Sequence, residues 1–264
     1  MVTLEATDIR FSYPGGISAA DGLSLRLAAG ELVAVLGPNG SGKTTLIRLL
    51  AGLMTPDAGE VRLDGAPIER LEPRDRARKI ALVPQSLPHL PGVRVRDFVM
   101  GGRYAYGRRL RAPSEADHEA VSRGLELADV SGLESRPLPE LSGGQLQRVF
   151  VARALAQEAP ILLVDEPTAS LDPEHQIAVF RILEQLVRDE SRAVLVVTHD
   201  LNLAGQFASR IGLMTAGRVA AEGTPAEVLR PEVLEPVYGA YFRYGGWPST
   251  DGGREHPFVI PWAD

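Results

Sequence analysis

The segment from residue 37 to residue 45 carries the side chains of this sequence that are best suited to chemistry. In order, it reads Gly37, Pro38, Asn39, Gly40, Ser41, Gly42, Lys43, Thr44 and Thr45. The spacing G-x-x-x-x-G-K-[ST] is typical of a loop that wraps a polyphosphate, because glycine backbone turns tightly and leaves N–H groups free to face an anion. Lys43 would supply a positive charge to the β- and γ-phosphates, and the Thr44 hydroxyl is suited to binding Mg²⁺.

The residues on either side of this loop predict the structure that it needs. Residues 31–36 are an apolar run with β-branched side chains, which predicts a buried strand, and residues 46–51 have a helical pattern. A strand, a glycine loop and a helix in this order are the context in which the pattern binds phosphate. The alternative, a glycine turn without a ligand, is disfavoured by that context.

Polar side chains follow three further predicted strands. Asp165 and Glu166 come after the apolar run 161–164, His199 follows the run 193–197 by one residue, and Gln85 lies just beyond a strand that starts at residue 80. In open α/β sheets, ligands bind at the carboxyl ends of the strands. Asp165 can hold the Mg²⁺ shell of a phosphate-loop NTPase, and Glu166 can polarise an attacking water. Taken singly, either acid could be a cap, and Gln85 could be a solvated loop residue.

A second helix start is also suited to an anion. Ser142 is a good N-cap, Gly143 and Gly144 leave the backbone open, and a long helix is expected to run from there to residue 157. A capped helix alone would be ordinary. The paired glycines are the unusual feature.

Composition limits the class of protein. The 264 residues are 44% hydrophobic and 23% charged, which is typical of a soluble globular protein, and the net charge of −6 disfavours a general nucleic-acid binder. There is no cysteine, so disulfides and thiolate metal sites are excluded. No run approaches the ~20 apolar residues of a membrane span, and the first residues do not resemble a signal peptide. Any membrane role is therefore expected to depend on a partner.

The rest of the chain predicts a mixed architecture. Alternating segments at 2–12 and 23–27 predict an early antiparallel sheet. The block from about 88 to 158 is expected to be a helical insertion, with a helix over 114–129 capped by Ser114 and Asp117. Its basic and aromatic stretch, 103–111, could contact nucleic acid, but in an acidic chain a solvated loop or a protein-docking surface is expected instead. Residues 241–264, with aromatic side chains among Gly and Pro, are expected to form an extended flap or to be partly disordered.

With these segments in place, the chain resembles the ATP-binding-cassette (ABC) ATPases over residues 2 to about 235. The motifs occur in the order of that family: an adenine-stacking aromatic at Tyr13, the phosphate loop at 37–44, the glutamine loop at Gln85, the signature sequence Leu141, Ser142, Gly143, Gly144 and Gln145, the Walker B aspartate and catalytic glutamate at Asp165 and Glu166, the D-loop Ser170, Leu171 and Asp172, and the switch histidine at His199. From the local pattern alone, Tyr13 is better interpreted as a half-buried aromatic at a strand end.

The resemblance implies an α/β fold: a P-loop NTPase core with a parallel sheet, an N-terminal antiparallel β subdomain and an inserted α-helical subdomain. We expect a single domain over 1–240, with the core at about 1–87 and 159–235, the helical subdomain at about 88–158, and a tail over 241–264.

The resemblance also implies a head-to-tail homodimer with two ATP molecules between the subunits. Lys43 and the loop amides would bind the phosphates of one ATP. The signature residues and Asp172 of the opposite subunit would close on it in trans. Glu166 would act as general base, His199 would contact the γ-phosphate, and Gln85 would join Thr44 and Asp165 around Mg²⁺. No motif residue departs from the active pattern, so a competent ATPase is expected.

Within the family, the chain is similar to the ATPases of iron-siderophore, haem and cobalamin importers. This likeness implies integral membrane permease subunits docking near Gln85 and residues 87–106, an extracytoplasmic solute-binding protein, no nucleic acid, and a peripheral position on the cytoplasmic face of the cell membrane. The alternatives are the ATPase of a system for another solute, an exporter, or a soluble ABC protein of translation or DNA repair. A phosphate-loop kinase or GTPase is argued against by the signature sequence.

Overall fold

The computed structural model describes residues 2–87, 89, 92–107, 112–168, 171–248 and 256–262. Its strands are β1 (Thr3–Tyr13), β2 (Ile17–Ala28), β3 (Leu32–Leu36), β4 (Ala58–Leu63), β5 (Ala66–Pro67), β6 (Ile80–Val83), β7 (Ile161–Asp165), β8 (Ala193–Val197), β9 (Arg210–Thr215), β10 (Arg218–Gly223), β11 (Phe242–Trp247) and β12 (His256–Pro261). Its α-helices are α1 (Lys43–Leu50), α2 (Pro73–Lys79), α3 (Val95–Met100), α4 (Glu115–Leu127), α5 (Gly143–Ala156), α6 (Pro173–Glu190), α7 (Leu201–Phe207), α8 (Pro225–Val228) and α9 (Pro231–Tyr238).

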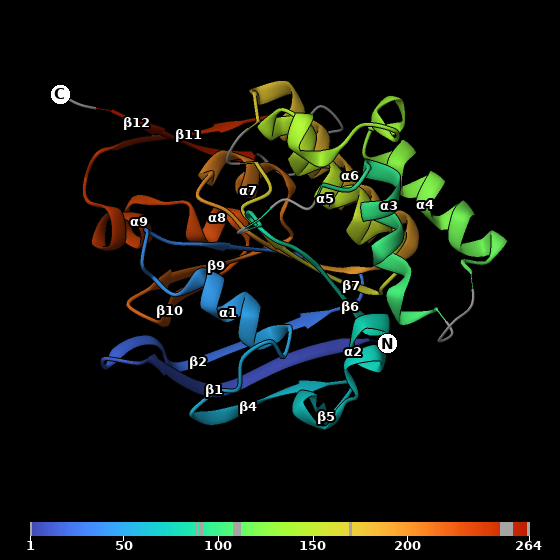
Figure 1. Ribbon diagram of the computed structural model, residues 1–264. Coiled ribbons are helices and arrows are strands. Elements are labelled where there is room, and N and C mark those ends of the chain that lie inside the picture. Colours follow the sequence, from blue (N-terminus) through green and yellow to red (C-terminus); the bar gives the residue numbers. More distant parts are fainter. Residues whose placement is uncertain are drawn as a thin grey trace.

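A six-stranded sheet crosses the middle of the molecule in the order β10-β9-β3-β8-β7-β6 (Figure 1). Its neighbours from β9 to β6 pair in parallel, and only β10 pairs antiparallel. Every residue of β3, β7 and β8 is buried, because both faces of the sheet are covered. The three predicted apolar strands are thereby confirmed, and their carboxyl ends share one edge.

A second sheet is antiparallel, with the order β2-β1-β4-β5. Helix α1 lies between the two sheets, and its leucines pack into one hydrophobic cluster with both of them (Figure 1). Strand β2 begins at Ile17 and is longer than the segment 23–27 that the alternation predicts. The early antiparallel sheet is confirmed, and its extra length brings residues 17–19 beside the loop that precedes α1.

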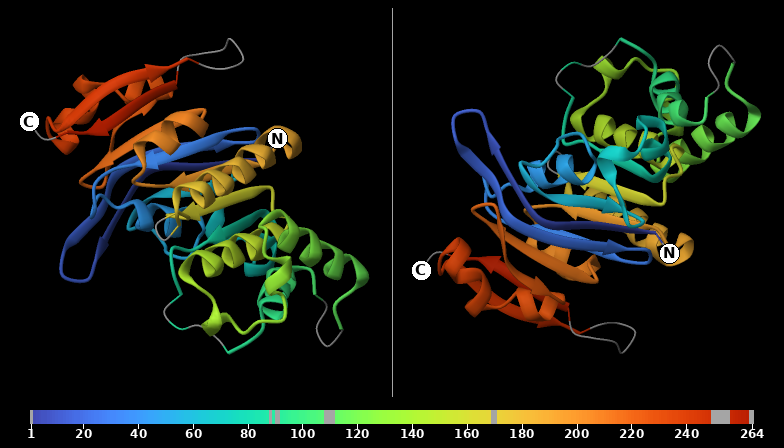
Figure 2. Two further views of the ribbon diagram at one scale, coloured as in Figure 1. Left: turned by 90° about the horizontal axis from the view of Figure 1, so that it is seen from above. Right: turned by 90° about the horizontal axis from the view of Figure 1, so that it is seen from below.

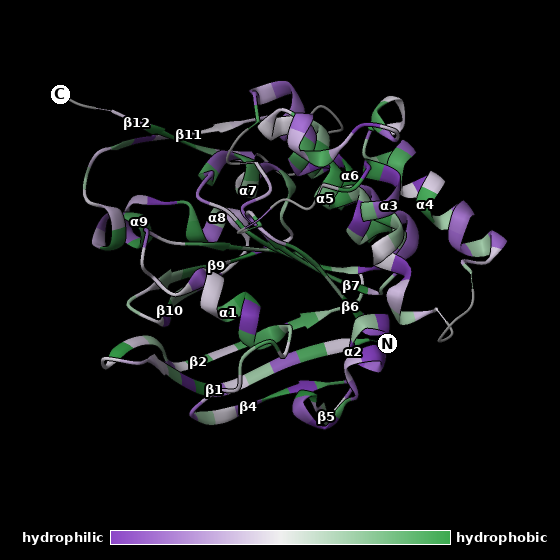
Figure 3. Cartoon of the chain, viewed as in Figure 1, coloured by the Kyte–Doolittle hydropathy of each residue, from purple (hydrophilic) through white to green (hydrophobic). Residues whose placement is uncertain are grey.

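The helices α3, α4 and α5 gather at one end of the molecule (Figure 2). Ser114 caps α4 through a capping box with Asp117, as the sequence predicts. The other face of the central sheet packs with α5 and α6 in the larger hydrophobic cluster. Figure 3 shows this pattern as hydrophobic central strands and hydrophilic outer helix faces.

One expectation for this region is wrong. Arg103 does not belong to a solvated loop: it is 7% exposed and lies in a 3-10 turn, Gly101–Ala105. Its guanidinium donates to Asp117 at 2.9 Å, to Glu158 at 2.7 Å and to the Ala156 carbonyl at 2.9 Å. A buried arginine is stable here because two carboxylates and a carbonyl meet it. Residues 108–111 of the same stretch lie outside the described residues.

The described part of the tail is more regular than an extended flap, and residues 249–255 and 263–264 lie outside the described residues. Strands β11 and β12 form an antiparallel hairpin, with Phe242 opposite Pro261 and Trp247 opposite His256. The hairpin lies at the opposite end of the molecule from α3–α5 (Figure 2). Among the described residues, no helix is long and apolar enough to cross a membrane.

Candidate nucleotide-binding site

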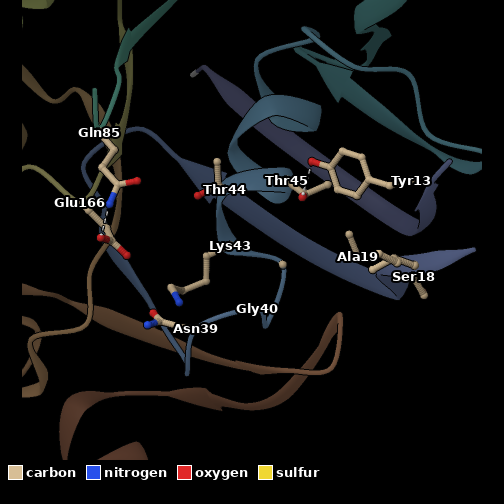
Figure 4. Close-up of a pocket in the computed structure, with 12 residues that line it drawn as sticks. Tyr13, Ser18, Ala19, Asn39, Gly40, Lys43, Thr44, Thr45, Gln85 and Glu166 are labelled. Atoms are coloured by element: carbon tan, nitrogen blue, oxygen red, sulfur yellow. Dashed lines mark hydrogen bonds between the residues drawn. The ribbon is translucent and has the colours of Figure 1, made fainter. Parts of the chain in front are cut away.

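The loop between β3 and α1 opens onto a cavity of about 460 Å³. The side chains around it come from β1, β2, α1 and the two loops that follow β6 and β7 (Figure 4). Its lining consists of Tyr13, Ile17, Ser18, Ala19, Asn39, Gly40, Gly42, Lys43, Thr44, Thr45, Gln85 and Glu166. Most of the residues that the sequence predicts for a phosphate site therefore border one space.

Glycine is required at two places in this loop. Gly42 precedes α1 with φ = 100°, and a Cβ there would lie 2.1 Å from the Ala19 carbonyl oxygen. Gly37 has φ = 151°, and a Cβ there would lie 2.3 Å from the Met214 carbonyl oxygen. No side chain caps α1 at Gly42, so the first N–H groups of the helix are left for a ligand.

Lys43 is the first residue of α1 and is only 5% exposed. Its ammonium donates to the carbonyl oxygens of Gly37 and Pro38 at 2.8 and 3.0 Å. Burial lowers the pKa of Lys43, and the nearby charges of Glu166 and Asp165 oppose that shift. The loop thus holds its cation in place before any anion arrives.

Thr44 and Asp165 meet at the edge of the central sheet. The Thr44 hydroxyl donates to an Asp165 carboxylate oxygen at 3.4 Å. Burial raises the pKa of Asp165, while the bond from Thr44 opposes the rise. One hydroxyl and one carboxylate are the hard oxygen donors that Mg²⁺ uses when it keeps waters and substrate phosphates as its other ligands. The two residues fit such an ion, and no cluster of three or more His, Cys, Asp or Glu ligands occurs in the described part of the chain.

Gln85 and His199 both approach Glu166. The Gln85 amide donates to a Glu166 carboxylate oxygen at 2.7 Å, and the His199 Nδ1 lies 3.9 Å from the same oxygen (Figure 4 shows the first pair). Glu166 has φ = 47°, an uncommon backbone conformation for a non-glycine residue. Gln85 and His199, which lie 81 positions before and 33 positions after Glu166 in the sequence, thus meet it beside the phosphate loop.

Tyr13 lies on the far side of the cavity from Gln85 (Figure 4). Its hydroxyl is 3.0 Å from the Thr45 hydroxyl, and its ring meets Phe11 edge to face at 5.1 Å. These contacts fix the ring at the end of β1. Tyr13 is therefore a half-buried aromatic at a strand end that also lines the cavity.

A second cavity, of about 380 Å³, opens at the start of α5. Ser142 and Gln145 form a capping box there: the Gln145 N–H donates to the Ser142 hydroxyl at 3.3 Å, and the Ser142 N–H donates to the Gln145 side chain at 3.1 Å. Its lining consists of Ser142, Gly143, Gly144, Gln145, Arg148, Leu171, Asp172 and His175. The signature sequence and the D-loop therefore border one space, although Ser170 lies outside the described residues.

Several residues that line the two cavities belong to none of the predicted motifs, His175, Ser18 and Ala19 among them. His175 lines the second cavity and places its Nδ1 2.6 Å from Asp172. Its position three residues after Asp172, at the start of a helix, is the signal that could have indicated this contact. Ser18 and Ala19 line the first cavity from β2. The sequence held no signal for them, since only the pairing of β2 with β1 brings them there.

The ABC transporter family model matches residues 20–169. This chain belongs to the ABC transporter family. The hemin import ATP-binding protein HmuV of Nocardia farcinica is 44% identical over 90% of this chain and 83% of its own length. The ferric enterobactin transport ATP-binding protein FepC of Escherichia coli is 37% identical over 85% of this chain and 83% of its own length.

Solved structures agree. A chain of a metal-chelate type ABC transporter in an inward-facing conformation is 26% identical, with a TM-score of 0.84, covering 100% of this ABC protein and 98% of that chain. A dimeric ABC transporter cassette bound to ADP and phosphate after hydrolysis is 30% identical, with a TM-score of 0.77, over 84% of this chain and 98% of that one. The fold predicted from sequence is confirmed, and the ABC protein is an ATPase.

Proposed function

We propose that this ABC ATPase energises the import of an iron chelate, haem or cobalamin. The observation that carries the proposal is the coincidence of a cavity bordered by the phosphate-loop residues with relatives that align over most of the chain. Those relatives are named for hemin import, siderophore transport and cobalamin import. Similarity over nearly its whole length to a chain of a metal-chelate type transporter supports it.

The chain's own groups suffice to bind a triphosphate at the first cavity. The backbone N–H groups of the loop and of the first turn of α1 face the phosphates, and Lys43 adds its charge to the β- and γ-phosphates. Tyr13 offers its ring to the adenine at the other end of the cavity. A Mg²⁺ ion held by Thr44 and Asp165, with Gln85 beside it, would neutralise charge on the β- and γ-phosphates.

Glu166 is the general base of the proposed reaction. It takes a proton from water as that water attacks the γ-phosphorus, and the bond to the leaving ADP oxygen breaks. Gln85 donates to the Glu166 carboxylate and orients it, and His199 lies beside it to contact the γ-phosphate. The strained backbone at Glu166 aims the carboxylate into the cavity.

The second cavity completes the site in trans. Ser142, Gly143 and Gly144 of one subunit close on the γ-phosphate bound by the other subunit, with Gln145 and Asp172 around them. Leu141 precedes this group and packs against the hydrophobic core. A head-to-tail pair of subunits satisfies both cavities at once, because each subunit has one of each. A relative of known dimeric structure supports this arrangement.

The membrane permease is proposed to dock near Gln85 and along residues 87–106. This places the ATPase on the cytoplasmic face of the membrane, with a solute-binding protein on the other side and without nucleic acid. Because Arg103 is buried, it is not part of the docking surface, whereas the neighbouring Tyr104 is 68% exposed. We therefore expect the permease to contact exposed residues of this turn, such as Tyr104, and not Arg103.

The test uses the Glu166→Gln variant, which is expected to bind ATP, hydrolyse it very slowly and remain in the closed form. Tagged protein with ATP is used to pull down partners from solubilised membranes of its own cells, with Lys43→Ala as the control that cannot be trapped. A many-helix membrane protein in the first sample alone supports the proposal, and uptake of labelled hemin, ferric siderophore and cobalamin then identifies the solute. Ribosomal or DNA-repair partners without a membrane protein would overturn it.

A further inference from the structure

The C-terminal strap, defined here as residues 231–248 and 256–262, contacts two elements of the ATP site. It consists of α9 and the β11–β12 hairpin (Figure 1). One contact reaches α7, the helix that begins just after His199. The other reaches Gly37, the first glycine of the phosphate loop.

The hairpin is tied to α7 by a pair of hydrogen bonds. The Asn202 side chain donates to the Val259 carbonyl at 3.1 Å and accepts from the Val259 N–H at 2.8 Å. Gly205 allows the close approach, since a Cβ there would lie 2.9 Å from the Pro257 carbonyl oxygen. Asp200 caps the helix by accepting from the Asn202 and Leu203 N–H groups. The strap therefore holds the turn of backbone that directly follows His199.

Tyr238, at the end of α9, reaches the phosphate loop. Its hydroxyl is fully enclosed and makes a polar contact with the backbone of Gly37, which lowers the pKa of Tyr238 against the larger effect of burial. Among the described residues this contact falls short of a hydrogen bond of full geometry, so it is a weak one. Burial raises the pKa of Tyr238 to about 12, so the hydroxyl stays protonated. The Ser41 hydroxyl is likewise enclosed and unpaired, and a Cβ on Gly37 would lie 2.7 Å from it. Two hydroxyls thus flank the loop where its backbone turns.

The two contacts belong to one continuous packed path. Tyr238 meets Phe242 edge to face at 6.0 Å, and Phe242 meets Tyr244 at 6.3 Å. Tyr244 is paired across the hairpin with Val259, which is 1% exposed and is the residue that holds Asn202. A shift at either end of this path would be resisted by the packed rings between them.

We propose that the C-terminal strap is a positioning element of the ATP site: Tyr238 supports the phosphate loop at Gly37, and Asn202 sets the start of α7 and with it His199. The second half rests on the role proposed for His199 above. The two residues act through others, so the expected effects are on kinetic parameters and not on the chemistry itself.

The test is steady-state ATP hydrolysis by the full chain. Tyr238→Phe keeps the ring and removes only the hydroxyl, and is expected to raise KM for ATP about three- to tenfold with little change in kcat. Asn202→Ala removes both bonds to Val259 and is expected to lower kcat about three- to tenfold with KM nearly unchanged. The controls are Tyr244→Phe, a similarly enclosed hydroxyl in the same strap, and Gln206→Ala, one turn along α7; both are expected to match the wild type.

The double variant sharpens the result. Non-additive effects of Tyr238→Phe and Asn202→Ala would show that the strap couples the contact at Gly37 to the contact at α7. Wild-type kcat and KM in both single variants would overturn the proposal. A loss of activity that only follows a lower Tm and fewer ATP-binding molecules, with kcat and KM per site unchanged, would also overturn it. If His199→Ala alone leaves turnover normal, the role of His199 fails, while the KM effect of Tyr238→Phe still tests the strap.

Discussion

The two helix starts that can receive a phosphate, at α1 and at α5, are built in opposite ways. Helix α1 has glycine at its N-cap, so no side chain competes for its N–H groups, and a buried lysine stands at its first position. Helix α5 is closed by its own capping box, in which Ser142 and Gln145 satisfy each other's backbone N–H groups. The first can bind an anion unaided, whereas the second must give up internal hydrogen bonds to do so.

This difference explains why one site would bind ATP and the other would close on it. A closed cap costs little when it is exchanged for hydrogen bonds to a charged phosphate, which are stronger than the neutral ones they replace. Free phosphate is also disfavoured at α5, because the Arg148 that lines this cavity is already paired with Asp129. The second site is therefore suited to a phosphate that another subunit already presents.

The largest expected effect comes from Lys43→Ala. It removes the charge that defines the α1 site and is predicted to weaken ATP binding by at least about 100-fold, since a charge-assisted contact to two phosphates is lost. Titration with a fluorescent ATP analogue measures it. Retained tight binding would show that the two helix starts do not differ as described.

Ser142→Arg addresses the α5 site. The large cation is expected to leave ATP affinity of the monomer within about twofold and to reduce the ATP-dependent dimer of the Glu166→Gln background more than about tenfold, because it fills the space for the partner's phosphate. Light scattering with and without ATP measures the dimer. A normal ATP-driven dimer would count against closure through this helix.

Asp117→Asn tests the support beneath α5, because Glu158 directly follows that helix and shares Arg103 with Asp117. Hydrogen bonding to Arg103 lowers the pKa of Asp117 to about 2. A carboxylate with a lowered pKa stabilises the fold above its unfolded pKa near 4, and this contribution is lost as the pH falls towards 2. The variant is expected to lose about 1–2 kcal/mol of unfolding free energy at pH 7.

The same carboxylate predicts a pH dependence. The difference in unfolding free energy between wild type and Asp117→Asn is expected to be constant from pH 7 to about pH 5 and to shrink as the pH falls to 3. Urea unfolding at four pH values measures it. A difference that is absent at pH 7, or that grows towards pH 3, would contradict the assignment.

The smallest effect is expected from Gln145→Ala, which opens half of the capping box. Helix α5 should lose about 0.5–1 kcal/mol of stability, because the Ser142 N–H loses its partner. ATP binding at α1 should not change. Urea unfolding measures the effect at the start of α5, and ATP titration of the same preparation measures the effect at the start of α1. A weakened ATP affinity would mean that the capping box supports the α1 site as well.

Much of this could be predicted from the sequence, for a physical reason. Strands β3, β7 and β8 are buried on both faces, so their apolar runs stand out, and the polar residues after them necessarily meet at one sheet edge. The phosphate loop is predictable because only glycine fits at positions 37 and 42, which gives the loop a recognisable pattern. The division of the chain into core and helical subdomain, and the role of each site residue, stay predictions.

The failures arise where long-range pairing overrides local composition. Arg103 was expected at the surface because its neighbours are basic and aromatic, but Asp117 and Glu158, 14 and 55 residues away, bury it. The tail has no strong periodic pattern of apolar residues, and its hairpin is held by Asn202, which lies 57 residues before Val259. His175 lines the second cavity because the start of α6 borders the same space as the start of α5, and nothing local in the sequence indicates that neighbourhood.

The central claim, that an α1 site of one subunit is completed by the α5 site of another, is tested most directly by mixing two inactive variants. Lys43→Ala lacks the first site and Ser142→Arg lacks the second, so each homodimer is expected to be inactive. A mixed head-to-tail dimer would contain one intact site, formed by Lys43 of one subunit and Ser142 of the other. The account predicts that mixing restores ATP hydrolysis well above the sum of the two variants. Turnover that stays at that sum, although mixed dimers form, would contradict it.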